Sequence, residues 1–82
     1  MSDEYLKYEA LLGRNRHEQE ELRKRIRGLV LSLRQLIDPT LAAENLKSEL
    51  ISAQALDLFK MQTALWELQE QAAVINEALG RG

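Results

Sequence analysis

Apolar residues recur at alternating spacings of three and four along the first half of the chain. The positions of this series are Tyr5, Tyr8, Leu12, Asn15, Gln19, Leu22, Ile26, Leu29, Leu33 and Leu36. Such spacing aligns the side chains along one face of a helix, and its persistence over several heptads is typical of coiled-coil-like packing. We therefore predict a helix over about residues 3–37, capped at its start by Ser2 or Asp3.

Two consecutive positions of this seam, Asn15 and Gln19, are polar, and Gly13 lies beside them. The unbroken phase of the pattern favours a continuous helix that contains one polar layer. The alternative is a break at Gly13, with Asn15 capping a new helix and Glu18 completing a capping box. If Asn15 and Gln19 are buried, they would set the register and the number of helices that assemble. If they lie near an exposed end, they would only face water.

A turn at Asp38 and Pro39 divides the chain into two helical halves. The residue before a proline disfavours helical geometry, so the first helix should end just before it. Aspartate is also a good helix cap, and proline fits the first helical position, where its missing N–H is not needed. We therefore predict a second helix over about residues 39–79, with Gly80 as its C-terminal cap.

So short a turn makes the two helices antiparallel neighbours. The fold class predicted for the single domain at residues 1–82 is therefore all-α, a coiled-coil-like two-helix hairpin. The seam of the second helix consists of Ile51, Gln54, Leu58, Met61, Leu65, Leu68, Ala72, Ile75 and Leu79. With so short a turn, Asn15 and Gln19 should lie roughly opposite Asp57 and Lys60. The first predicted helix carries a net charge of +2 and the second −4, which favours their pairing.

The second helix carries another apolar stripe, which the hairpin seam does not use. It consists of Leu56, Phe59 and Trp66, with Ala73 beyond them, on the outer side of the helix. One helix of a lone hairpin cannot bury both faces, and exposed Phe and Trp together favour aggregation. We therefore predict that the hairpin dimerises into a four-helix bundle through this stripe. The first helix would contribute Leu22, Ile26, Leu29 and Leu33 to the interface.

The composition agrees with a small protein that needs a partner. An 82-residue chain has room for one small domain, and such domains are only marginally stable alone. The net charge of −2 indicates neither a nucleic-acid nor a membrane partner, and the absence of cysteine excludes disulfides and thiolate metal sites. No apolar run approaches the ~20 residues that cross a bilayer. The acidic N-terminus lacks a signal segment, so we expect a cytoplasmic protein.

The basic residues suggest an alternative function. Arg23, Arg25 and Arg27 form the densest basic stretch, as in a small dimeric hairpin that binds nucleic acid through its phosphates. However, these residues fan around the helix, and acidic residues lie one turn before them. No aromatic residues interleave with them to stack on bases. We therefore favour a solvated helix face and do not expect a nucleic-acid partner.

No residue pattern indicates catalysis, a cofactor or a metal site. His17 is the only histidine and has no second ligand of matching type, and the carboxylates of the second helix are spread around it. The chain has no glycine-rich phosphate loop and no nucleophile motif. We therefore expect a non-enzymatic interaction module of structural, adaptor or small helical chaperone type. It would bind itself, and another protein is the alternative partner for Phe59 and Trp66.

Overall fold

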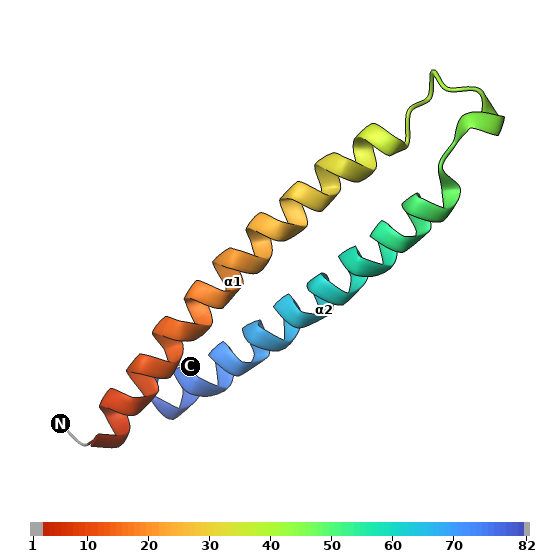
Figure 1. Cartoon of the computed structure of the whole chain (residues 1–82). Coiled ribbons are helices and arrows are strands. Elements are labelled where there is room, and N and C mark those ends of the chain that lie inside the picture. Colours follow the sequence, from red (N-terminus) through yellow and green to blue (C-terminus); the bar gives the residue numbers. More distant parts are fainter. Residues whose placement is uncertain (1–2, 82) are drawn as a thin grey trace.

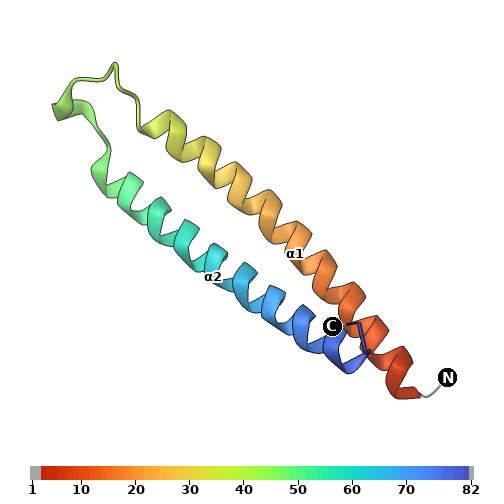
Figure 2. The ribbon, with the colours of Figure 1, turned by 180° about the vertical axis from the view of Figure 1, so that it is seen from behind.

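A computed structural model of the chain describes residues 3–81 as a long antiparallel helical hairpin (Figure 1). Helix α1 spans Asp3–Leu36, helix α2 spans Ser48–Ala78, and the short 3-10 helix η1 spans Ala43–Asn45 between them. No strand occurs in this described part of the chain. The molecule measures 64 by 16 by 15 Å, and α1 begins at the end where α2 finishes (Figure 2). The predicted helical hairpin is therefore confirmed.

Helix α1 runs without interruption through Gly13, so the continuous-helix interpretation is correct and the alternative break is wrong. The charges at its ends suit the helix dipole, because Asp3 and Glu4 lie in the first turn and Arg34 lies in the last. Ser2, one of the two predicted caps, lies outside the described residues.

The predicted turn at residues 38–39 is too short. Helix α2 begins at Ser48 instead of Pro39, and residues 37–47 form a longer connector that contains η1. Asp38 makes the bonds of a cap, because its Oδ1 accepts hydrogen bonds from the Thr40 hydroxyl at 2.7 Å and from the Thr40 backbone N–H at 2.9 Å. Only a single turn follows, closed by the Leu41 N–H donating to the Asp38 carbonyl at 3.2 Å, and no α-helix starts there.

The bonds from Thr40 also affect the acidity of Asp38. The hydroxyl of Thr40, and then its backbone N–H, lower the pKa of the Asp38 carboxyl below its ordinary value because both donate to the charged form. The carboxylate is therefore held in its charged form by the turn that it caps.

The helices pack through the two predicted seams. On α1 the seam residues Leu12, Asn15, Gln19 and Leu33 are buried, and its other members are half-buried apart from the more exposed Tyr8. On α2 every seam residue is half-buried. Two helices in contact along one line cannot enclose a core, so the seam side chains still touch water at their edges.

The C-terminal end of α2 has the predicted glycine cap. Gly80 has a φ of 75°, its N–H donates to the Glu77 carbonyl at 3.0 Å, and the N–H of Arg81 donates to the Asn76 carbonyl at 2.8 Å. These two bonds form a Schellman motif, which satisfies carbonyls at the helix end. The chain then turns back so that the Arg81 guanidinium donates to the Tyr5 hydroxyl at 3.1 Å and to the Glu9 carboxylate.

Candidate functional site

Helix α2 carries apolar side chains on two faces, and α1 covers only one of them. Each residue turns a helix by ~100°, so Trp66 lies roughly 100° from Leu65 of the seam and roughly 160° from Leu68. Phe59 precedes Trp66 by two turns and shares its face. We call the set Leu56, Phe59, Trp66 and Ala73 the outer stripe.

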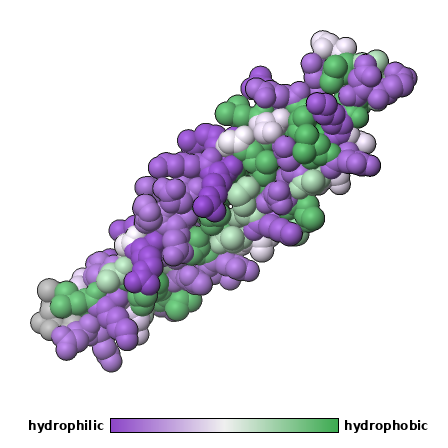
Figure 3. All heavy atoms as spheres, in the orientation of Figure 1, coloured by the Kyte–Doolittle hydropathy of each residue, from purple (hydrophilic) through white to green (hydrophobic). Residues whose placement is uncertain are grey.

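The outer stripe is exposed in the hairpin. The exposed fractions are 53% for Leu56, 59% for Phe59 and 51% for Trp66, and Ala73 is exposed as well. A surface view shows hydrophobic side chains reaching the outside of the hairpin between hydrophilic ones (Figure 3). Large contiguous apolar patches on small proteins mark interaction sites. The stripe predicted from the sequence is therefore present and uncovered in the single chain.

Thr63 continues the apolar surface between Phe59 and Trp66. Its hydroxyl donates to the carbonyl oxygen of Phe59 at 2.9 Å, so its hydrogen-bonding capacity is engaged within the helix. A partner could therefore cover Thr63 without leaving this donor unpaired. Glu70 interrupts the stripe before Ala73, which limits the continuous apolar run to residues 56–66.

The four residues of α1 predicted to join the interface lie in the hairpin seam. Leu33 is buried, and Leu22, Ile26 and Leu29 are half-buried beside α2. These side chains already stabilise the contact between the two helices of one chain. In an oligomer, these four side chains would contact a partner only through the part of their surface that α2 does not cover.

Asn15 and Gln19 form a hydrogen-bonded ladder inside the seam. Their exposed fractions are only 5% and 8%. The Asn15 amide donates to the backbone carbonyl of Leu68 on α2 at 2.8 Å, and the Gln19 amide donates to Asn15 Oδ1 at 2.7 Å. Arg23 completes the ladder by donating to Gln19 Oε1 at 3.1 Å. The polar layer is therefore buried and hydrogen-bonded, and the alternative of an exposed layer that faces water is wrong.

The partner of this ladder differs from the expected one. Asn15 contacts Leu68, whereas a two-residue turn had placed it and Gln19 near Asp57 and Lys60. The cause is the longer connector, which delays the start of α2 and so sets α1 against residues further along that helix. The predicted alignment was wrong for that reason.

The structure divides the three arginines of the basic stretch between two sides of the hairpin. Arg23 and Arg27 line one groove with Leu65 of α2, whereas Arg25 lines another groove with Leu68. No ion pair holds any of the three within the described residues. They are exposed, but they do not form one continuous basic face.

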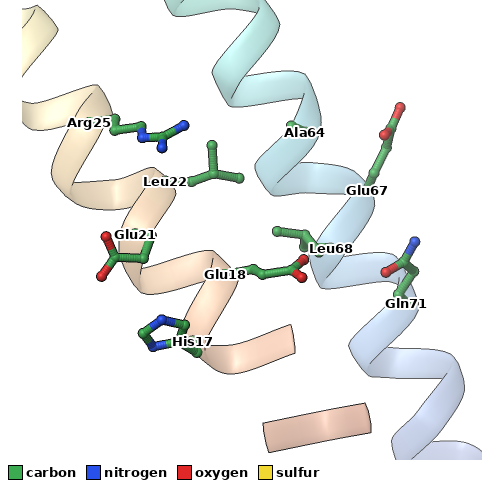
Figure 4. A pocket seen from close by; sticks show the side chains of 9 residues that line it. All are labelled: His17, Glu18, Glu21, Leu22, Arg25, Ala64, Glu67, Leu68 and Gln71. Atoms are coloured by element: carbon green, nitrogen blue, oxygen red, sulfur yellow. The ribbon is translucent and has the colours of Figure 1, made fainter. Parts of the chain in front are cut away.

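The groove beside Arg25 gathers the largest set of titratable groups. Its volume is about 370 Å³, and it is lined by His17, Glu18, Glu21, Leu22, Arg25, Ala64, Glu67, Leu68 and Gln71. Glu18 and Leu22 point toward α2, whereas His17 and Glu21 point away from it (Figure 4). No hydrogen bond joins two of these side chains, and residues 3–81 contain no group of three or more His, Asp or Glu placed to hold a metal ion.

Further large apolar side chains at the connector end of the hairpin are exposed. Ile37, Leu41 and Leu46 of the connector are exposed, as is Leu50 in the first turn of α2. Between Pro39 and Lys47 the sequence contains no glycine or serine, the residues that usually mark a connector. We interpreted the leucines and alanines of this segment as helix, so their exposure in a connector was not anticipated.

Comparisons with known proteins do not assign the chain to a family. No protein-family model, no curated protein and no solved structure matches it. Within residues 3–81, neither long helix is apolar enough to cross a lipid bilayer. The function must therefore be inferred from the surfaces themselves.

Proposed function

We propose that this chain is a non-catalytic protein–protein interaction module that binds a second copy of itself through α2. One observation carries the proposal: α2 packs against α1 with one face and exposes Leu56, Phe59 and Trp66 on the other. Fully burying an exposed side chain of this size contributes roughly 1.5–3 kcal/mol, and because these are already about half covered, about half of that remains to be gained at an interface. Aromatic residues are also the usual anchors of protein interfaces.

Size favours a second copy as the partner. A hairpin of 82 residues has a single line of helix contact, and domains this small commonly gain stability by oligomerisation. Two hairpins bring four helices together in one symmetric dimer. Such a dimer suits a structural, adaptor or small chaperone role, in which a further protein would bind the assembled surface.

The nucleic-acid alternative has weaker support. Arg25 lies on the opposite flank of α1 from Arg23 and Arg27, so the three cannot contact one phosphate backbone together. Binding through phosphates would be strongest at low salt. We expect no shift of RNA or DNA in a gel at low ionic strength, and a shift that is lost in Arg23→Ala and Arg27→Ala variants would favour the alternative.

The proposal is tested by measuring mass and fluorescence across a dilution series. Trp66 is the only tryptophan, so its emission reports on the outer stripe alone. We expect light scattering to give the mass of a dimer at high concentration. On dilution to the monomer, the Trp66 emission should move to longer wavelength as the indole becomes exposed.

A pair of variants separates the stripe from general surface hydrophobicity. Trp66→Ala should weaken association by more than about tenfold, because truncation of a buried aromatic anchor commonly removes more than about 1.4 kcal/mol. Leu6→Ala is the matched control, since Leu6 is similarly exposed at 53% but lies on α1. A monomeric mass at every concentration, with unchanged Trp66 emission, would contradict self-association.

A further inference from the structure

We infer that two copies meet through their α2 helices, packed antiparallel about a two-fold axis that passes between Phe59 and Thr63. The inference rests on the proposed self-association and specifies which helices form the interface. In this arrangement the two α2 helices lie at the centre of the assembly, and each α1 lies on the outside.

The position of the outer stripe on α2 determines the side from which a partner approaches. In a compact four-helix bundle each helix turns one continuous apolar sector toward a common core. On α2 the outer stripe instead lies roughly 100–160° around the helix from the seam that contacts α1. A partner that covers Phe59 and Trp66 therefore approaches α2 from the side away from α1.

Helix α1 offers no matching stripe to a second copy. Its exposed large apolar residues are separated along its length, with Leu6, Tyr8 and Leu11 near one end and Val30 and Leu31 toward the other. Its middle surface is occupied by charged residues. The surface of a second copy that best complements one outer stripe is therefore the other outer stripe.

The order of residues in the stripe is self-complementary when the helices run antiparallel. With an axis between Phe59 and Thr63, the large Phe59 of one copy meets the small Thr63 of the other, and Leu56 meets Trp66. A parallel pair would instead place Phe59 against Phe59 and Thr63 against Thr63. Alternation of large and small side chains fills an interface better than like-sized layers do. The axis also lies near the middle of Ser48–Ala78, so the helices overlap along almost their whole length.

The charges along α2 favour the same direction. Glu67, Glu70 and Glu77 lie in its C-terminal half, whereas Lys60 lies in its N-terminal half. A parallel pair would bring these carboxylates beside their own copies, and close like charges are unfavourable. An antiparallel pair separates them and brings Lys60 of one copy toward Glu67 of the other.

Distances between spin labels can test this arrangement, because the chain has no cysteine and each introduced one is unique. Three single variants place a label at exposed positions outside the outer stripe: Gln62→Cys near the axis, Glu77→Cys at the end of α2, and Glu20→Cys on α1. Glu20 lies level with the middle of α2, since the nearby Asn15 bonds to Leu68. Light scattering first establishes the mass of each labelled variant.

The antiparallel arrangement predicts a distinct distance for each label. Gln62 labels should lie within about 20 Å, because neighbouring helices are ~8–10 Å apart. Glu77 labels should lie about 45–50 Å apart, since each is ~16 residues from the axis at ~1.5 Å per residue. Glu20 labels should lie about 25–35 Å apart, across three helix spacings.

The outcomes distinguish the inference from the proposal beneath it. A dimeric mass with the three expected distances supports the antiparallel α2 pair. A dimeric mass with equally short distances at Gln62 and Glu77 overturns it in favour of a parallel pair, and a short distance at Glu20 overturns it in favour of contact through α1. A monomeric mass in the unlabelled chain overturns self-association and the inference with it.

Discussion

Asn15 joins the two helices through the main chain of its partner. Its amide donates to the Leu68 carbonyl, and its own oxygen accepts from Gln19, so this buried side chain both donates to α2 and accepts within α1. A buried amide without a partner is unfavourable by about 1–3 kcal/mol. The ladder is therefore satisfied only in the alignment that brings the Leu68 carbonyl within reach, and slipped alignments are disfavoured.

We expect Asn15→Ala to lower the free energy of unfolding by about 1–3 kcal/mol, because Gln19 loses its acceptor in a buried place. Denaturant unfolding followed by circular dichroism measures the change. Gln35→Ala is the control, since Gln35 is exposed on the same helix and should change stability little. Equal stability of the two variants would show that the ladder does not hold the helices together.

The spacing of the seam was enough to place Asn15 and Gln19 between the helices, but not to identify Leu68 as the partner. Which residues belong to the seam depends on helical periodicity, and this can be read from the sequence of each helix alone. The partner depends on the length of the connector, where Asp38 bonds to Thr40 as a helix cap would but only a single turn follows. The same residues and the same bond serve either a turn or a helix start, so the pattern alone did not decide where α2 begins.

The two helices differ in how much of their apolar surface is covered within the hairpin. Helix α1 has one apolar seam, and its exposed Leu6, Leu11, Val30 and Leu31 lie toward its two ends with charged residues between them. Helix α2 has apolar residues on nearly opposite sides, and such a helix is stable when it is covered on both. The difference between the helices thus follows from their sequences, and it explains why we assign the interface to α2.

Two glycines allow opposite predictions from the same chemical change. At Gly28, within α1, an added Cβ would meet nothing within 4 Å, so Gly28→Ala should raise the free energy of unfolding by about 0.5–1 kcal/mol by restricting the unfolded chain. At Gly80 the φ of 75° disfavours any Cβ, so Gly80→Ala should lower it by about 1–2 kcal/mol. Thermal or denaturant unfolding measures both.

The signs of these two changes matter more than their sizes. Loss of stability in Gly28→Ala would mean that another surface packs closely against this side of α1, which the proposed arrangement leaves outside. Unchanged stability in Gly80→Ala would mean that the C-terminal Schellman motif contributes nothing to the fold.

For the whole molecule, the proposed dimer makes charge on α2 a determinant of association. Lys60→Glu should weaken the dimer by up to about thirtyfold at low salt, since the two-fold axis produces two such ion pairs and each contributes at most ~1 kcal/mol. Glu67→Lys should act similarly, and the two substitutions together should restore much of the affinity. Sedimentation equilibrium at low and high salt measures the effect, which should shrink as salt screens the charges.

The control for this exchange is Lys47→Glu, which makes the same change in net charge in the connector, away from the outer stripe. It should leave the dissociation constant nearly unchanged. If the double variant instead binds more weakly than either single variant, Lys60 and Glu67 are not neighbours across the interface, and the antiparallel pairing of α2 is contradicted.

The sequence by itself determined that this protein is a pair of long helices, which side of each helix meets the other, and that α2 has a second apolar face. These features follow from the spacing of side chains on a regular helix, where ~3.6 residues complete each turn. The same local rule correctly predicted a continuous helix through Gly13 and a glycine cap at Gly80.

Only the tertiary structure decided where α2 begins, which residues of the two helices lie opposite each other, and that Arg23 extends the Asn15–Gln19 ladder while Arg25 faces another side. All of these depend on the path of the connector at residues 37–47, which sets the alignment of the helices. That path consists of a turn at residues 38–41 and the 3-10 helix η1 before α2 begins at Ser48. The length of this segment shifts every contact between α1 and α2 together, and the periodicity within either helix does not reveal such a shift.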